Sequence, residues 1–250
     1  MQTLDTPPGK IVLITGAAHR VGATIARHVH RLGMNVIVHY RSSRTAAESL
    51  QGELESQRPN SVHLIQGDLL DTSGLAELIN QASQWQGRLD VLVNNASSFY
   101  PTPVADADET QWDDLLGSNL KAPFFLAQAA SPYLRQQHGC IVNIVDIHAE
   151  RPLKGYAIYS IAKAGLVMLT KTLARELAPE IRVNAVAPGA ILWPELGASA
   201  ETRKHIIAQT ALKRQGDPHD VASAVTFLIQ QAGYMTGQIL TVDGGRSLSN

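Results

Sequence analysis

Two side chains that could carry proton-transfer chemistry, Tyr159 and Lys163, lie four residues apart in a segment with helical periodicity. This spacing places them on one face of a helix, about one turn apart. A neighbouring ammonium favours a phenolate, so we expect Lys163 to lower the pKa of Tyr159 from about 10 toward neutrality. Such a phenol is a suitable proton donor near pH 7. Because Tyr and Lys often share an amphipathic helix, the pair needs support from its surroundings.

Two further polar residues are expected beside this pair. Asp146 follows an apolar run thirteen residues before Tyr159, where the end of a strand would place it in the same crevice. A carboxylate offers no donor to a developing oxyanion, but it suits a substrate with N–H donors or a ring nitrogen that takes up a proton. Asn119 lies in a long apolar helical segment. The alternative for Asn119 is an ordinary helix asparagine with satisfied hydrogen bonds.

A glycine-containing turn, TGAAHRVG at 15–22, directly follows the first apolar run and leads into a helical segment. The N-terminus of a helix presents unpaired N–H groups and a partial positive charge, which suit a pyrophosphate. The alternative is a tight turn that binds nothing. The candidate pyrophosphate ligands are Gly16, His19, Arg20, Val21 and Gly22.

The second strand-like run lacks the acidic residue that would hold the ribose hydroxyls of NAD. It ends instead in basic and hydroxyl side chains that suit a 2′-phosphate, namely Tyr40, Arg41, Ser42 and Ser43. We therefore expect NADPH rather than NADH; a solvated basic turn is the alternative, and it fits Arg44 best. Further candidate contacts to adenosine follow the third and fourth strands at Asp68, Leu69, Asn95 and Ala96.

The elements that must position these residues alternate between short β-rich runs and longer helical segments, as in βαβ units. Expected strands are Ile11–Thr15, Val36–Tyr40, Val62–Gln66, Val91–Asn94, Cys140–Val145, Arg182–Ala187 and Gln238–Val242. Expected helices are Val21–Leu32, Ala46–Gln57, Gly74–Gln86, Glu109–Gln137, Tyr156–Leu177 and Pro218–Gln230. The pattern predicts an α/β fold: a Rossmann-type, doubly wound parallel sheet of about seven strands with helices on both faces, whose ligands bind beyond the carboxyl ends of the strands.

No repeat or linker divides the 250 residues, so we expect one domain over 1–250 with a flexible N-terminus at 1–10. The stretch 188–216 mixes Pro, Gly and Trp193 with a short polar helix at Ala200–Gln209. A long excursion after a strand is commonly a lid over a site, and an ordinary surface insertion is the alternative.

Composition excludes several classes of partner. With 21 basic and 22 acidic side chains, no general positive field attracts nucleic acid or an anionic membrane surface. No apolar run approaches the ~20 residues of a membrane span and the N-terminus is not signal-like, so we expect a cytoplasmic protein. The one cysteine, Cys140, excludes an internal disulfide. The nine histidines show no metal-binding spacing, so no metal is expected.

Taken together, these motifs resemble the short-chain dehydrogenase/reductase family. The turn at 15–22, the NNA triplet at 94–96, Asn119, the Tyr159/Lys163 pair, Pro188-Gly189 and DGG at 243–245 follow that family's order and spacing. The resemblance implies a seven-stranded Rossmann sheet and a homotetramer. It also implies that Asn119 holds a proton-relay water, Tyr159 is the acid, and Lys163 binds the nicotinamide ribose. Pro188 and Gly189 then count among the cofactor-binding residues.

Two departures from that family pattern resemble pteridine reductases: Asp146 stands where most members carry serine, and Arg20 stands where many carry glycine. The string NNASSFYPTP at 94–103 adds to this resemblance. It implies that Phe99 stacks a planar pterin against the nicotinamide and that Ser97 binds the pterin and the cofactor phosphate. Packing under a loop is the alternative for Phe99. The substrate-binding candidates are Arg20, Ser97, Phe99, Asp146, Tyr159 and Tyr156, the last of which could equally be a core residue.

The resulting hypothesis is an NADPH-dependent pteridine reductase of the dihydromonapterin or dihydrobiopterin type. It would transfer hydride to a C=N bond of a pterin or dihydropterin, and dihydrofolate is a possible further substrate. One alternative is a carbonyl reductase of the 3-oxoacyl type on the same scaffold. Another, from a different class, is a non-catalytic NADPH-binding sensor.

Overall fold

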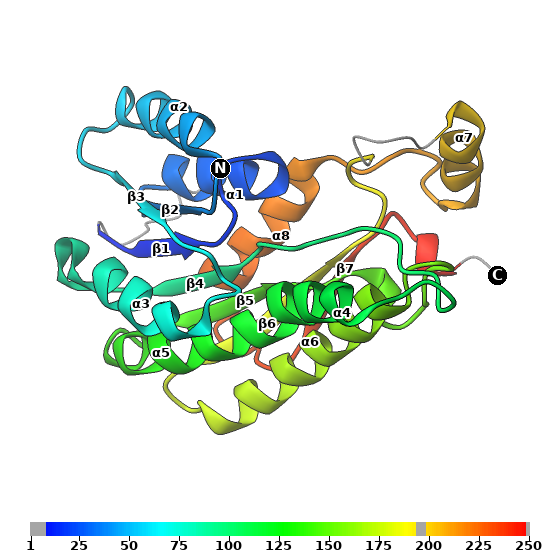
Figure 1. Ribbon diagram of the computed structural model, residues 1–250. Coiled ribbons are helices and arrows are strands. Elements are labelled where there is room, and N and C mark those ends of the chain that lie inside the picture. Colours follow the sequence, from blue (N-terminus) through cyan, green and yellow to red (C-terminus); the bar gives the residue numbers. More distant parts are fainter. Residues whose placement is uncertain (1–8, 194–198, 249–250) are drawn as a thin grey trace.

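Seven parallel strands form one sheet in the computed structural model, which describes residues 9–193 and 199–248. The strand order is β3-β2-β1-β4-β5-β6-β7, so successive crossovers run outward in opposite directions from β1 and β4 (Figure 1). This is the doubly wound topology expected from the sequence, with its switch point between β1 and β4. The strands are β1 (Ile11–Ile14), β2 (Asn35–Tyr40), β3 (Val62–Gln66), β4 (Val91–Asn94), β5 (Cys140–Ile144), β6 (Arg182–Pro188) and β7 (Ile239–Val242).

The sheet is buried on both faces, and β1 shows why, because it is apolar at every position. In β1, Val12 and Ile14 pack into one hydrophobic cluster, and Ile11 and Leu13 pack into the other. All four side chains are fully buried. A continuous apolar run is what a strand needs when helices cover both sides of its sheet.

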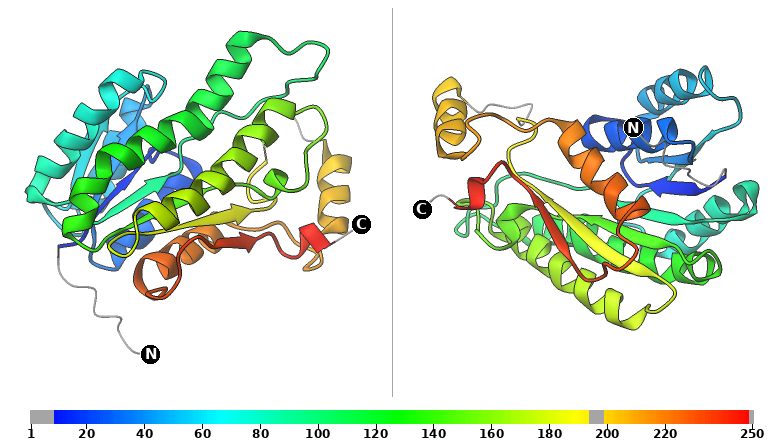
Figure 2. Two further views of the ribbon diagram at one scale, coloured as in Figure 1. Left: turned by 90° about the horizontal axis from the view of Figure 1, so that it is seen from below. Right: turned by 180° about the vertical axis from the view of Figure 1, so that it is seen from behind.

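Helices form one layer on each face of the sheet (Figures 1 and 2). On one face lie α1 (Arg20–Arg31), α2 (Arg44–Glu55) and α8 (Pro218–Gln230), and on the other lie α3 (Leu75–Gln84), α5 (Ala122–Gln136) and α6 (Ala157–Glu176). Short 3₁₀ turns follow or precede several of these elements: Thr72–Gly74, Trp85–Gly87, Ile147–Ala149 and Arg246–Leu248. The expected helices are present with ends shifted by a few residues, except that the one expected over 109–137 is divided.

The segment expected as one helix over 109–137 is interrupted. The structure has α4 (Glu109–Leu116), a π-helical turn at Gly117–Lys121, and then α5. Asn119 lies within the π turn, and its side-chain Nδ2 donates to the carbonyl of Leu115 at 3.0 Å. In a regular α-helix that carbonyl would accept the backbone N–H of Asn119, so the side chain competes with the helix for it. Single π turns within helices are frequent at functional sites.

The excursion after β6 lies at the carboxyl edge of the sheet. The expected helix within it is confirmed as α7 (Ala200–Gln209), which stands apart from both helical layers (Figure 2). Of the expected lid at 188–216, residues 194–198 lie outside the described residues, as do 1–8 of the expected flexible N-terminus.

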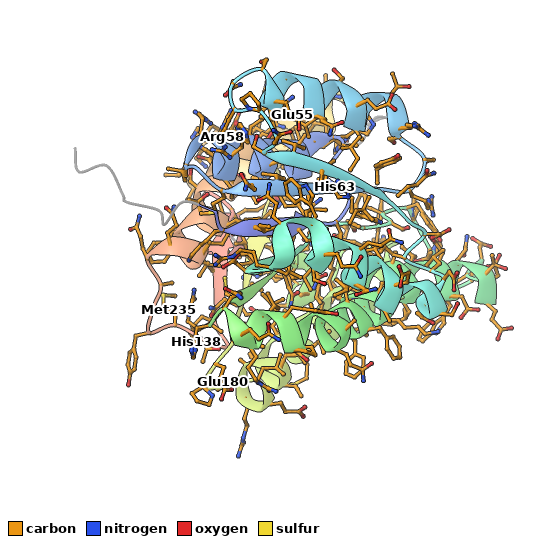
Figure 3. All side chains as sticks on the ribbon, turned by 90° about the vertical axis from the view of Figure 1, so that its left-hand side faces the viewer. Glu55, Arg58, His63, His138, Glu180 and Met235 are labelled. Atoms are coloured by element: carbon orange, nitrogen blue, oxygen red, sulfur yellow. The ribbon has the colours of Figure 1, made fainter. Side chains whose placement is uncertain are left out.

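The opposite edge of the sheet carries structural contacts. Figure 3 views this edge, where Arg58, His138 and Met235 lie in segments that precede strands. The Arg58 guanidinium donates to the backbone carbonyls of His30 and Met34, which ties the start of β3 to the end of α1. Among the described residues, one helix, α6, is long and apolar enough to span a membrane by composition, but 56% of its apolar window is buried in the fold.

Candidate active site

The turn between β1 and α1 leaves room for a close ligand. A Cβ at Gly22 would lie 2.6 Å from both Asn95 Nδ2 and the Gly16 carbonyl, so only glycine fits there. Gly16 has a φ of +61°, a conformation that glycine adopts without strain. The N-cap residue of α1, His19, forms no side-chain cap, and the first turn carries no acidic residue. This helix end therefore offers its N–H groups and dipole to an anion.

Thr15 and Asn95 hold this turn against the loop after β4. Thr15 Oγ1 accepts hydrogen bonds from the backbone N–H groups of Asn95 and Ala96, both at 3.0 Å. In return, Asn95 Nδ2 donates to the carbonyls of Thr15 at 2.9 Å and Gly16 at 3.2 Å. Asn95 thus shapes the phosphate turn. Sequence reasoning missed Thr15, although a hydroxyl directly after the first strand is a usable signal.

His39, at the end of β2, supports the same turn, and it too was not predicted from the sequence. Its Nδ1 accepts the N–H of Gly16 at 3.1 Å, and its Nε2 bonds to the carbonyl of Gly67 at 3.2 Å. These contacts require the neutral tautomer with the proton on Nε2. Burial lowers the pKa of His39 to about 4, so the ring remains neutral at physiological pH. A histidine directly after the apolar run 36–38 of β2 was the available signal.

Beyond β2, the residues expected to bind a 2′-phosphate lie at the surface. The guanidinium of Arg44 is bonded to Glu48 at 2.8 Å, within its own helix. Arg41 is exposed, and none of the described acidic residues pairs with it. Ser42 and Ser43 follow directly. Arg41 is therefore better placed than Arg44 to meet an incoming phosphate.

The loop after β3 gives its two candidates different surroundings. Asp68 Oδ1 accepts the N–H of Leu70 at 3.0 Å, which closes a tight turn. Leu69 is only 7% exposed and packs in the core cluster that contains α3. Leu69 therefore has its side chain in the core, and its polar backbone groups are what it can offer a ligand.

At the end of β5, Asp146 meets the catalytic helix. The hydroxyl of Tyr159 donates to Asp146 Oδ2 at 2.9 Å, and the backbone N–H of His148 donates to Oδ1 at 2.8 Å. Tyr159 is 4% exposed, whereas Asp146 is half-buried. The sequence prediction that both side chains reach one crevice is consistent with this contact.

The expected effect of Lys163 on Tyr159 is wrong. Burial first, and then the charge and hydrogen bond of Asp146, raise the pKa of Tyr159 well above 10. The Nζ atom of Lys163 lies 5.6 Å from the centroid of the Tyr159 ring and donates to the Ile144 carbonyl at 2.9 Å. The carboxylate is therefore the phenol's immediate charged neighbour, and it opposes ionisation.

Lys163 is itself strongly influenced by its surroundings. It is 3% exposed, and burial lowers its pKa to about 8, while the charge of Asp146 acts in the opposite direction. A lysine with this pKa remains mostly protonated at neutral pH, but it can exchange a proton at small cost. It lies one turn of α6 beyond Tyr159, as the spacing predicted.

Asn119 joins the π turn to the loop after β4. Its Oδ1 accepts the Ser97 hydroxyl at 2.6 Å, and its Nδ2 donates to the Ser98 carbonyl at 3.0 Å as well as to Leu115. The side chain is 1% exposed. These contacts hold the beginning of the SSFY loop, Ser97–Tyr100, on the π turn.

Phe99 projects from that loop into an aromatic cluster. Its ring stacks on Tyr156, with centroids 4.7 Å apart and an interplanar angle of 16°. It meets Tyr159 edge-on at 4.8 Å and 75°. With 41% of its surface exposed, Phe99 can still offer one face to a planar ring. In this arrangement Tyr156 packs against one face of the Phe99 ring.

Two further contacts connect the excursion after β6 to the site. An Arg20 guanidinium nitrogen donates to the carbonyl of Trp193 at 3.3 Å, and the Trp193 ring lies 5.6 Å from the guanidinium carbon of Arg203 in α7. At the end of β6, the N–H of Gly189 donates to the carbonyl of Val242 at 3.0 Å. The excursion therefore lies beside the phosphate turn and the ends of β6 and β7.

The fold gathers the sequence-predicted residues at the carboxyl edge of the sheet. The β1–α1 turn holds Gly16, His19, Arg20, Val21 and Gly22, and the end of β2 and the segment after it hold Tyr40, Arg41, Ser42 and Ser43. Asp68 and Leu69 follow β3; Asn95, Ala96, Ser97 and Phe99 follow β4; and Asp146 follows β5. Asn119 lies in the π turn, Tyr156, Tyr159 and Lys163 lie at the start of α6, and Pro188 and Gly189 lie at the end of β6.

Comparison with known proteins identifies the family of this chain. The chain belongs to the short-chain dehydrogenase/reductase family of oxidoreductases, whose members bind NAD(P)H; a family model described as enoyl-(acyl carrier protein) reductase matches residues 16–247. Among its relatives, pteridine reductase 1 of Leishmania tarentolae is 36% identical over 98% of both chains. The 3-oxoacyl-(acyl-carrier-protein) reductase of Staphylococcus epidermidis is 38% identical over 94% of this chain and 98% of its own. The Staphylococcus aureus enzyme of that name is also 38% identical, over 94% and 97%.

Proposed function

We propose that this protein is an NADPH-dependent pteridine reductase that reduces a C=N bond of a pterin or dihydropterin, with dihydrofolate as a further substrate. The observation that carries the proposal is the hydrogen bond from Tyr159 to Asp146 Oδ2. A carboxylate beside the acid can accept N–H groups of a pterin, and it repels the oxyanion of a reduced ketone. The relative that is a pteridine reductase adds support.

The cofactor assignment rests on two features of the described chain. The first is the uncapped N-terminus of α1 with Gly16 and Gly22, which fits a pyrophosphate. The second is Arg41, which follows β2 where an acidic residue would favour NAD. Arg41 with Ser42 and Ser43 would hold a 2′-phosphate, and Lys163 would hold the nicotinamide ribose. When bound, NADPH supplies the hydride.

The chain's own residues would then manage the proton. Tyr159 keeps its proton at neutral pH and presents it at Oη. Asp146 fixes the direction of that hydroxyl and has lone pairs left for a substrate N–H. After Tyr159 has donated its proton to the ring nitrogen, Lys163, with a pKa of about 8, can supply a new proton to Tyr159. Asn119, which bonds to Ser97, would position a relay water at the loop.

Phe99 would position the planar ring of the pterin by stacking on it. Its stacked partner Tyr156 fixes one side of the Phe99 ring, and the exposed side would cover the pterin. Offset stacking of aromatic rings contributes about 0.5–1.5 kcal/mol beyond the burial of their surface. Ser97 and Arg20 would contact both the pterin and the cofactor phosphates, as the resemblance implies.

The second candidate is reduction of a 3-oxoacyl thioester, because relatives with that activity are 38% identical to this chain. The discriminating experiment is NADPH oxidation by the purified protein against dihydrobiopterin, dihydromonapterin, dihydrofolate and an acetoacetyl thioester. Tyr159→Phe is the control for the chemical step. Turnover of a pterin by the wild type alone supports the proposal, and turnover of the thioester alone overturns it. Binding of NADPH without any turnover would favour a sensor.

We further propose that the enzyme is a cytoplasmic homotetramer, as the resemblance implies. A largely apolar hollow supports assembly; it is lined by Leu116, Leu120, Phe124, Phe125 and Leu169, together with Lys121. Trp112, close by on α4, is 45% exposed. Sedimentation equilibrium measures the state directly, and a monomer at micromolar concentration would contradict this part of the proposal.

A further inference from the structure

One carboxylate, Asp114 of α4, holds both neighbours of Phe99. The Ser98 hydroxyl donates to Asp114 Oδ1 at 3.2 Å, and the Tyr100 hydroxyl donates to Oδ2 at 2.8 Å. Asp114 is half-buried and lies one turn before the π turn. Because the two donors flank Phe99 in the chain, the contacts restrain the backbone on both sides of that residue.

The shorter of these contacts, from Tyr100 at 2.8 Å, is the one that the charge of Asp114 strengthens most. Burial, followed by the hydrogen bond and charge of Asp114, raises the pKa of Tyr100 to about 12, so the Tyr100 phenol remains a donor at neutral pH. Hydrogen bonds to ionised acceptors are shorter and about twice as strong as neutral ones. Asp114 therefore contributes a fixed anchor.

The loop is also held at its two ends. At one end, Ser97 bonds to Asn119 at 2.6 Å. At the other, the Thr102 N–H donates to the Gly155 carbonyl at 2.6 Å, and Thr102 Oγ1 accepts the N–H of Ile158 at 3.3 Å. These end contacts keep the loop on the molecule. Within the loop, Asn119 Nδ2 holds the Ser98 carbonyl at 3.0 Å, and Asp114 adds the side-chain contacts on both sides of Phe99.

We propose that Asp114 is a positioning residue that gives the site its specificity for planar heteroaromatic rings, because it fixes the Phe99 ring against Tyr156 and Tyr159. This inference rests on the proposed function and extends it to a residue outside the reacting groups. Loss of the anchor lets Phe99 leave the stacked geometry of 4.7 Å and 16°. A flexible acyl substrate has no need of that geometry, whereas a planar ring depends on it.

The test compares Asp114→Ala with Asp113→Ala, an exposed neighbour on the same helix whose replacement changes helix propensity equally. We expect kcat/KM for dihydrobiopterin to fall about tenfold in Asp114→Ala, mainly through KM, and to stay within about twofold in Asp113→Ala. The Kd for NADPH stays unchanged in both. Asp114→Asn, which keeps one acceptor oxygen, gives an intermediate value. Tyr100→Phe changes no residue of α4 but removes the Tyr100 hydroxyl's contacts with Asp114 at 2.8 Å and with the Gln111 carbonyl at 3.5 Å, so it tests the clamp if Asp114→Ala unfolds.

A double-mutant cycle separates positioning from a general loss of structure. If Asp114 acts through Phe99, Asp114→Ala costs little further kcat/KM in a Phe99→Ala background. Full additivity of the two losses, or an unchanged KM in both Asp114→Ala and Tyr100→Phe, overturns the inference.

Hydrogen–deuterium exchange provides a readout that needs no substrate. We expect amides of 97–102 to exchange faster in Asp114→Ala than in Asp113→Ala, while those of α6 are unchanged. Equal exchange in the two variants contradicts the clamp. If exchange is faster but the wild type reduces no pterin, the proposed function fails and the claim of specificity for planar rings falls with it, while the clamp on Phe99 stands.

Discussion

The hydroxyl of Tyr159 points at a carboxylate: it donates to Asp146 Oδ2 at 2.9 Å, and Oδ1 of the same group is held by the backbone N–H of His148. The orientation of Asp146 is therefore fixed by the 3₁₀ turn that it caps, Ile147–Ala149. As a result, the proton of Tyr159 is directed along the end of β5. A serine at this position could donate a hydrogen bond to a substrate oxygen, which ionised Asp146 cannot do.

The first prediction concerns the acidity of Tyr159. Since the charge and hydrogen bond of Asp146 help to raise its pKa, Asp146→Asn lowers the pKa of Tyr159, although burial still keeps it above that of an ordinary tyrosine. Ultraviolet titration of the phenol measures this value, with Tyr159→Phe subtracted to isolate the signal. An unchanged titration would mean that burial alone sets the pKa.

The second prediction concerns substrate choice at the same position. Asp146→Ser replaces an acceptor with a donor aimed at the reacting atoms, so kcat/KM for dihydropterins falls by about 100-fold or more while that for an acetoacetyl thioester rises. The ratio of the two rates, measured with saturating NADPH, is the readout. Equal losses on both substrates would show that Asp146 serves the fold and not the selection of substrate.

The sequence was sufficient to predict the strands, the doubly wound parallel sheet with helices on both faces, and a site beyond the carboxyl ends of its strands. Continuous apolar runs and helical periodicity carry that information locally. The π turn was not predictable in this way, because it depends on Asn119 binding both Leu115 and the distant Ser98. The pairing of Tyr159 with Asp146 was anticipated, but the direction of the pKa shift was not. The four-residue spacing of Tyr159 and Lys163 places both on one helix face, but it does not say how far the ammonium lies from the phenol.

The residues that sequence reasoning missed share one property. Thr15, His39 and Asp114 each act on a loop that is distant in the chain, by 80 residues between Thr15 and Asn95 and by 23 between Gly16 and His39. A side chain that supports another loop carries no local motif, since its meaning depends on which elements the sheet brings together. Such residues became visible only through their hydrogen bonds.

The third prediction tests the cofactor assignment. Arg41→Ala raises the KM for NADPH by about 10- to 100-fold and changes the KM for NADH little, because a charge-assisted contact to the 2′-phosphate is lost. Arg44→Ala is the matched control: its guanidinium is bonded to Glu48, so its loss changes the NADPH preference only slightly. Equal effects of the two variants on NADPH would indicate a diffuse basic surface in place of a specific contact.

The fourth prediction uses two glycines with opposite surroundings. Gly22→Ala brings a methyl within 2.6 Å of Asn95 Nδ2 and the Gly16 carbonyl, so it distorts the phosphate turn, weakens NADPH binding and destabilises the fold by about 1–3 kcal/mol. Gly52→Ala, in α2, meets nothing within 4 Å and stabilises the helix by up to about 1 kcal/mol. Urea unfolding and NADPH titration measure both. A Gly22→Ala protein with unchanged Kd would refute close ligand approach.

The last prediction follows from the neutral ring of His39 beneath the phosphate turn. Its pKa is about 4 in the folded protein against an ordinary value of 6.5, so between these values the unfolded chain binds the extra proton. Stability therefore falls as the pH drops through this window. From about pH 7.5 to about pH 5, the wild type loses about 2 kcal/mol more free energy of unfolding than His39→Gln. Urea unfolding at both pH values measures this, with exposed His205→Gln expected to match the wild type. Parallel losses in all three proteins would show that His39 is not the titrating group, and that the acid sensitivity of the fold arises elsewhere.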